Sequence, residues 1–214
     1  VEYYRETRSA ANVALLYSSR TVDWYAGVDI PWADRAGLQA AKAEAVGSFN
    51  QAFYGFYEIL VRSRIPFDVI DEETVAAGEL GRYDLAILPN CACLDGAVCR
   101  AISDWVRVGG TIIADFETAH YDEFGGRRRT TGLAEVFGVE SLNELAGPRR
   151  CDFALVGPNP PEYLGRLDAA IMPAPRHNLR VRLAGGTAPI VFCRPLVSNI
   201  PEAIEPSDEP FLVE

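Results

Sequence analysis

The chain has 214 residues, of which 49% are hydrophobic, and a formal net charge of −10. This length suits one domain of ordinary size, and the hydrophobic share argues against a disordered chain. The negative charge repels phosphate backbones, so nucleic acid is not expected as a partner. No apolar run approaches the roughly 20 residues that span a bilayer, and the polar start lacks the apolar stretch of a signal peptide. We therefore expect a cytoplasmic protein that does not contact a membrane.

The first 115 residues alternate between apolar runs and helical patterns. Each run is apolar almost throughout, which is typical of strands that are covered on both faces. Strands connected in this way by helices form a parallel sheet with right-handed crossovers. The sequence therefore predicts a flavodoxin-like, three-layer αβα fold with helices on both faces of a mainly parallel sheet. Its strands are expected at residues 13–17, 67–70, 83–88 and 111–115.

The helices of this region have recognisable ends. The longest helical pattern runs to about Arg64, where Pro66 ends it, and it carries one wide apolar stripe. Asp71 and Asp95 are suitable N-caps for the two helices that follow the second and third strands. Residues 18–34, between the first strand and the long helix, are interpreted as a polar and aromatic loop.

A different pattern begins after residue 115. Residues 147–175 are rich in Pro and Gly and are expected to be mostly irregular. Residues 179–183 alternate apolar and Arg side chains, and a Gly-rich turn separates them from a second apolar run at 189–193. We interpret these runs as an antiparallel pair, added to the sheet or lying beside it. The last residues, 204–214, end on the sequence FLVE, which is typical of the beginning of a strand.

Cysteine and histidine are too sparse to predict a metal centre or a disulfide framework. The five cysteines are an odd number in a long chain, and three of them fall within residues 91–99. The Cys-x-Cys pair at 91 and 93 has no second pair, and the only histidines are His120 and His177. We expect no metal and no cofactor, and interpret most cysteines as reduced packing residues.

Ligands of an open parallel sheet bind at the carboxyl ends of its strands, so these ends are the candidate sites. The hydroxyl-rich residues 18–21 have no glycine until Gly27, which makes a phosphate site improbable on sequence. Cys91 and Cys93 are the candidate nucleophiles, but they lack an adjacent base and the glycines of a nucleophile elbow. The acidic residues of 115–123 are an alternative carboxylate pair for glycoside chemistry, or a solvated loop balanced by the arginines at 127–129.

Three large aromatic residues gather within residues 18–34, namely Trp24, Tyr25 and Trp32. Exposing three such side chains is costly, so each needs a partner. They stack on a sugar, contact a neighbouring subunit, or fold back on the core. The first of these alternatives describes a carbohydrate-binding module, and the second an assembly domain.

Several segments resemble the trimerisation domain of the beta-galactosidases of glycoside hydrolase family 42 and related glycosidases. They are residues 12–18 (NVALLYS) with 23–25 (DWY), 60–68 (LVRSRIPFD), 84–90 (DLAILPN), 116–125 (FETAHYDEFG) and 133–138 (LAEVFG). The last two are the most specific. The resemblance covers residues 10–140 well and the remainder loosely.

The resemblance implies a class I glutamine amidotransferase-like fold without its catalytic residues, which holds subunits together as a trimer. In that fold the nucleophile follows the strand after the Gly-Gly helix end, and here Phe116, Glu117 and Thr118 occupy this degenerate elbow. It also implies a preceding TIM barrel, with residues 1–10 as the lead-in and 11–214 as a domain truncated at its C-terminus. The alternatives are a small hydrolase that uses Cys91 or Cys93, and a carbohydrate-binding module.

Overall fold

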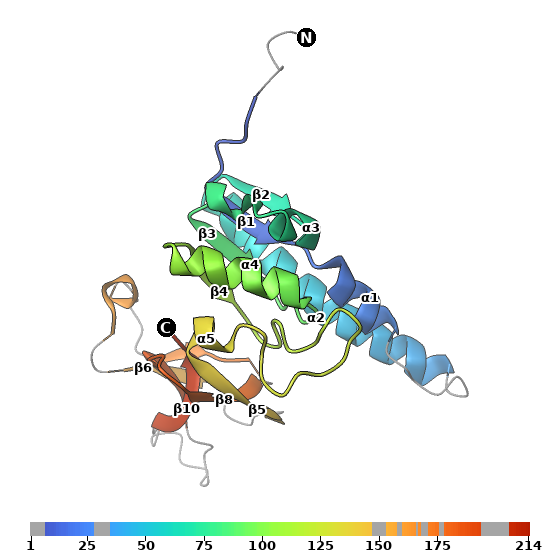
Figure 1. Cartoon of the computed structure of the whole chain (residues 1–214). Helices are drawn as coiled ribbons and strands as arrows, with labels where there is room; N and C mark the ends of the chain where they lie inside the picture. Colours follow the sequence, from blue (N-terminus) through green and yellow to red (C-terminus); the bar gives the residue numbers. More distant parts are fainter. Residues whose placement is uncertain are drawn as a thin grey trace. The chain divides into compact units, whose positions relative to one another are not determined.

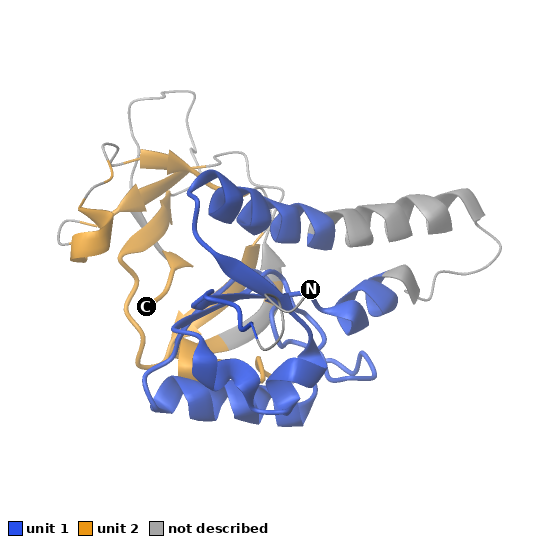
Figure 2. Ribbon diagram, turned by 90° about the horizontal axis from the view of Figure 1, so that it is seen from above, with its two compact units in different colours: residues 1–128 blue, residues 129–214 orange. Residues whose placement is uncertain are grey.

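The computed structural model describes two compact units, Val1–Arg128 and Arg129–Glu214, which are taken one at a time (Figure 2). The residues it describes are 7–27, 35–146, 153–157, 160–165, 167, 171–175, 178–193 and 206–214. Within these ranges no helix is both long and apolar enough to cross a membrane.

The first unit is built on a four-stranded parallel sheet in the order β2-β1-β3-β4 (Figure 1). Its strands are β1 (Val13–Leu16), β2 (Phe67–Ile70), β3 (Leu85–Leu88) and β4 (Thr111–Ala114). Val13 of β1 pairs with Phe67 of β2 and with Leu85 of β3, and Leu85 pairs with Thr111 of β4. The predicted parallel sheet and all four predicted strands are confirmed.

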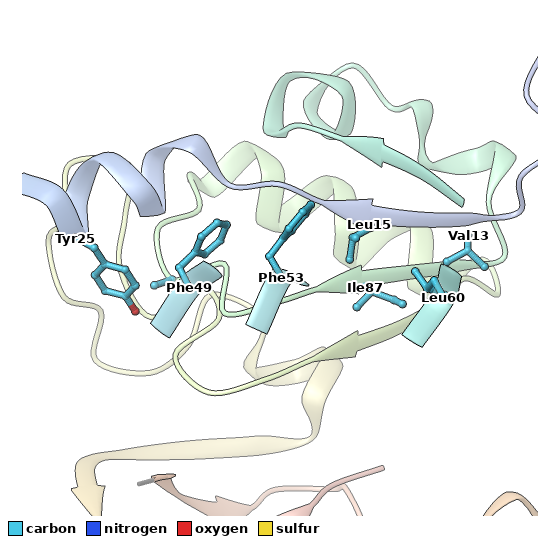
Figure 3. Packing of buried hydrophobic residues seen from close by; sticks show 8 residues of the cluster. Val13, Leu15, Tyr25, Phe49, Phe53, Leu60 and Ile87 are labelled. Carbon is cyan, nitrogen blue, oxygen red and sulfur yellow. The ribbon is translucent and has the colours of Figure 1, made fainter. Parts of the chain in front are cut away.

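Helices cover both faces of this sheet (Figures 1 and 2). The long helix α2 (Arg35–Arg62) lies on one face, and α3 (Glu72–Ala76) and α4 (Gly96–Arg107) lie on the other. On the α2 face, Leu15 and Ile87 pack with Phe49 and Phe53 in a buried cluster (Figure 3). Side chains of a strand alternate between the two faces of the sheet. The residues next to Leu15 in β1 and next to Ile87 in β3 therefore face α4.

Both predicted caps form. Asp71 accepts a hydrogen bond from the Thr74 amide at 2.9 Å at the start of α3. Asp95 accepts one from the Val98 amide at 2.8 Å at the start of α4. A glycine is required at Gly110, because a Cβ there would lie 2.3 Å from the Trp105 ring.

The segment after β1 differs from the sequence-based expectation of a loop. Residues Ser19–Gly27 form helix α1. Ser18 starts it, with its carbonyl accepting from the Val22 amide at 3.2 Å and its hydroxyl accepting from the Thr21 amide at 3.2 Å. Tyr25, on the same helix, joins the buried cluster. The stabilising contacts come from distant segments, and they outweigh the weak helical pattern of these polar residues.

The second unit consists of antiparallel strands, with the short helix α5 (Ala134–Phe137) before them. One sheet has the order β10-β9-β6-β7, and β5 pairs with β8 in a second. The strands are β5 (Val139–Ala146), β6 (Phe153–Val156), β7 (Ile171–Pro173), β8 (Asn178–Leu183), β9 (Ile190–Cys193) and β10 (Pro206–Leu212).

The predicted strands at 179–183 and 189–193 exist and are antiparallel, but the interpretation that they pair with each other is wrong. β8 pairs with β5, and β9 pairs with β6 and β10. The turn between β8 and β9 carries the chain from one sheet to the other. In this turn the Gly186 amide donates to the Gly138 carbonyl at 3.0 Å. The partner strands β5 and β6 were not predicted, because apolar and polar residues alternate only weakly in their sequences. A strand is present near the end of the chain, but it spans Pro206–Leu212 and so ends where the sequence was expected to begin one.

Candidate functional site at the carboxyl ends of the strands

The turn after β1 is occupied by a buried network of hydroxyl groups. The Ser18 hydroxyl lies 2.7 Å from Thr21 Oγ1 and donates to Glu72 Oε1 at 2.7 Å, while the Cys93 amide donates to Thr21 Oγ1 at 3.0 Å. Ser18, Thr21 and Glu72 are each fully buried. The network ties α1, α3 and the turn after β3 together. Its hydroxyls are used internally and a carboxylate lies among them, so this turn does not offer an anion cradle.

The turn after β3 holds the two candidate nucleophiles, and both are buried, as expected. Burial raises the pKa of the Cys91 thiol well above its ordinary value, and the charges of Glu72 and Asp115 add to the effect. Burial also raises the pKa of Cys93 to about 12, with further contributions from Asp122 and Glu117. The reactive form of a cysteine is its thiolate. These environments therefore suppress the nucleophile that a hydrolase mechanism requires.

The turn after β4 contains a residue with a side chain in the left-handed backbone region. Phe116 has a φ of 47°, which is uncommon for a residue with a side chain, and it is 39% exposed. Thr118 is buried, and its hydroxyl donates to backbone carbonyls, 2.7 Å from that of Asp115 and 3.2 Å from that of Leu88. Neither the ring at Phe116 nor the carboxylate at Glu117 supplies a thiol or hydroxyl. The position is thus shaped for exposure but carries no hydroxyl or thiol nucleophile at its apex.

Glu117 is held by two tyrosines. Tyr121 donates to its Oε1 at 3.0 Å and Tyr25 to its Oε2 at 3.2 Å. Asn90 joins the cluster, because its side-chain amide donates to the Tyr25 oxygen at 3.1 Å and its Oδ1 accepts from the Glu117 amide at 3.3 Å. Burial and the Glu117 charge raise the pKa of Tyr121 to about 12, and the same two causes raise that of Tyr25 further. Both phenols are therefore protonated donors at neutral pH.

Two other acidic residues of this loop, Asp115 and Asp122, have backbone partners. The Asn90 amide donates to Asp115 Oδ1, and burial nevertheless raises the pKa of the Asp115 carboxyl. Asp122 Oδ1 accepts from the amides of Phe124 and Gly126. These carboxylates therefore shape the turns that follow β3 and β4. Their hydrogen bonds explain their positions without a substrate.

The aromatic residues near the site fold onto this cluster. Tyr25 is 6% exposed. The Trp24 ring lies 4.3 Å from the Tyr121 ring, centroid to centroid, and a Cβ added to Gly125 would lie 2.0 Å from Trp24 Nε1. One part of the indole thus contacts Tyr121 and another contacts the Gly125 backbone. Trp32 and His177 lie outside the described residues.

The structure brings Tyr25, Asn90, Glu117 and Tyr121 together, and Cys93 lies beside this cluster, because its backbone forms a bridge with that of Tyr121. His120 is 1% exposed, with its ring edge-on to Tyr121. Sequence reasoning missed the role of Tyr121, and it missed Glu72 as a buried hydrogen-bond acceptor. The available signal was their position, since Glu72 follows closely on β2 and Tyr121 lies in the loop after β4. Among the described residues no group of three or more metal-ligating side chains is found.

The fold and these strand ends define the class of the protein as a flavodoxin-like α/β domain, with Phe at the apex of the turn after β4. The family described as "Beta-galactosidase trimerisation domain" matches residues 11–160, which is more than half of the chain. The chain belongs to this family. No curated protein sequence matches it significantly.

Solved structures agree with this assignment at the level of the fold. A beta-galactosidase from Bacillus circulans sp. alkalophilus matches with a TM-score of 0.67 and 16% identity, over 98% of this chain and 27% of that one. A cold-adapted beta-galactosidase from Rahnella sp. R3 matches with a TM-score of 0.59 and 19% identity, over 86% and 25%. A thua-like protein from Bacteroides uniformis matches with a TM-score of 0.55 and 15% identity, over 98% and 80%. The chain spans about a quarter of the length of the two beta-galactosidases.

Proposed function

We propose that this chain is a non-catalytic accessory domain that holds the subunits of a beta-galactosidase-like glycoside hydrolase together as a trimer. Its membership of the trimerisation domain family carries the proposal. The site chemistry supports it, because the strand ends where ligands of this fold class bind are filled by internal hydrogen bonds. Binding of other subunits gives a role to a domain that carries no catalytic residues.

The turn after β4 is proposed to be a degenerate nucleophile elbow made of Phe116, Glu117 and Thr118. The positive φ at Phe116 supports this, because an elbow holds its apex residue in strain so that the side chain projects from the sheet. Phenylalanine at the apex cannot attack a carbonyl carbon. The rival hydrolase, which would use Cys91 or Cys93, is disfavoured by the raised pKa of both thiols.

The proposed partners are further copies of this chain and a TIM barrel that precedes it in the same polypeptide. In this arrangement residues 1–10 lead in from the barrel, residues 11–214 form the assembly domain, and the enzyme is cytoplasmic. The two beta-galactosidases matched here are about four times as long as the matched segment, which supports the presence of additional domains. Galactoside hydrolysis would then belong to the barrel.

Analytical ultracentrifugation of the protein at its full natural length tests the assembly role. We expect a trimer at micromolar concentration, with beta-galactosidase activity that survives Cys91→Ser and Cys93→Ser. A monomer at that concentration would overturn the assembly role. Loss of beta-galactosidase activity in a correctly folded Cys93→Ser variant would contradict the non-catalytic role of this domain.

A role for Trp24, Tyr25 and Trp32 in contacting a neighbouring subunit or a sugar stays a prediction. Because Tyr25 is buried, Trp24 and Trp32 are the informative positions. Trp24→Ala and Trp32→Ala are to be compared by sedimentation and by galactose titration. A weakened trimer supports the subunit contact, and lost galactose binding with an intact trimer supports the sugar contact.

A further inference from the structure

Phe124 is the most exposed large apolar residue in the described part of the chain. Its side chain is 88% exposed, at the tip of the turn that follows the β4 elbow. A fully exposed phenylalanine leaves about 150–250 Å² of apolar surface in water. Single exposed apolar residues are common on flexible loops, so the question is whether this one is held in place.

The turn that carries Phe124 is closed by its own hydrogen bonds. Asp122 Oδ1 accepts from the Phe124 amide at 2.9 Å and from the Gly126 amide at 2.7 Å. The Asp122 amide donates to the Gly126 carbonyl at 3.0 Å, and a bridge joins Tyr121 to Arg127 on either side. Four interactions thus define a tight hairpin over residues 121–127, and its conformation does not depend on a partner.

The same hairpin is fastened to the body of the first unit. Gly125 lies directly against the Trp24 indole. The Arg128 guanidinium donates to the Tyr121 carbonyl and, at 2.6 Å, to the Leu94 carbonyl. These contacts hold both ends of the turn against α1 and the turn after β3. Phe124 is therefore presented on a pre-organised support, which reduces the entropy lost when it binds.

We propose that the hairpin of residues 121–127 is a docking anchor, and that Phe124 inserts into a neighbouring copy of this chain. An aromatic side chain on a rigid support is the usual form of an interface hot spot, because it buries a large area at little entropic cost. The surrounding contacts must supply the rest of the interface, since a stable one buries at least about 1,200 Å² in total.

A second copy is the favoured occupant, and this step rests on the proposed function. A closed three-fold ring has heterologous contacts, in which a projection on one subunit meets a different surface of the next. The family description also supports this occupant, because it names trimerisation and therefore further copies of the same chain.

The test is sedimentation of Phe124→Ser in the protein at its full natural length. Val108→Ser is the matched control, because Val108 is 83% exposed on the same unit, just beyond α4. Phe124→Leu keeps an apolar anchor. We expect Phe124→Ser to lower the association constant of each contact at least about 30-fold, and the other two variants to change it less than about 5-fold. Circular dichroism checks that each variant is folded.

The outcomes separate this inference from the proposed function. A trimeric wild type whose Phe124→Ser variant associates equally well overturns the anchor and leaves the assembly role intact. An unchanged trimer with a lower melting temperature also overturns it, because Phe124 then packs within its own polypeptide. A monomeric wild type overturns the assembly role itself. Selective dissociation of Phe124→Ser, with Val108→Ser still trimeric, supports the anchor.

Discussion

Gly125 offers the sharpest test of how the loop after β4 is built. Its φ of +77° is one that L side chains rarely adopt, and an added Cβ would meet Trp24 at 2.0–2.2 Å. Gly78 has nearly the same φ, +79°, with nothing within 4 Å of an added Cβ. An alanine at either position would therefore have the same unfavourable backbone conformation, but only an alanine at Gly125 would also collide with a neighbouring side chain. Substituting each by alanine separates the backbone cost from the packing cost.

The expected magnitudes follow from these two terms. The left-handed conformation costs about 1–2 kcal/mol for alanine, partly offset by about 0.4–1 kcal/mol from the stiffer unfolded chain. Gly78→Ala should thus lower the free energy of unfolding by about 1 kcal/mol. Gly125→Ala adds about 1–3 kcal/mol for overpacking against Trp24, which Tyr121 prevents from moving freely, for a total of about 2–4 kcal/mol.

Urea unfolding followed by far-UV circular dichroism measures both variants, and a third comparison isolates the indole. In a Trp24→Ala background the overpacking disappears, so Gly125→Ala should then cost no more than Gly78→Ala. If Gly125→Ala and Gly78→Ala differ by less than about 0.5 kcal/mol in the wild-type background, the close packing of the hairpin on Trp24 is wrong. The hairpin would then lose one of the contacts that hold it against α1, while its internal hydrogen bonds would remain.

Three further predictions concern titration, reactivity and capping. The raised pKa values of Tyr25 and Tyr121 mean that the unfolded chain loses these protons first, so unfolding free energy should fall as pH rises from about 10 towards 12. Tyr25→Phe should flatten that fall, and an equal slope in alkaline urea titrations would contradict it. Cys91 and Cys93 should resist iodoacetamide at pH 7 in the native protein and react in urea, as read by mass spectrometry. Asp95→Ala should lower stability by about 1–2 kcal/mol through the lost helix cap, and a melting temperature equal to the wild type's would refute this.

The parallel sheet could be predicted from sequence because its signals are local. Strands such as β1 and β3 are covered on both faces, so nearly every residue in them is apolar and the run is visible without any partner. Caps such as Asp71 lie within three residues of the amides they bind. Hydrophobic burial and capping therefore made the four parallel strands and the helices α2, α3 and α4 visible in the sequence.

Tertiary structure alone decided the features whose partners are distant in sequence. Helix α1 forms because Ser18 bonds to Glu72, 54 residues away, and because Tyr25 bonds to Glu117, 92 residues away. The strand pairing of the second unit could not be predicted from sequence either. The alternation of apolar and polar residues in β8 is compatible with any antiparallel partner, and only tertiary packing selects β5. The raised pKa of the Tyr25 phenol and the packing of Gly125 on Trp24 arise likewise from burial and from side chains that converge only in the folded chain.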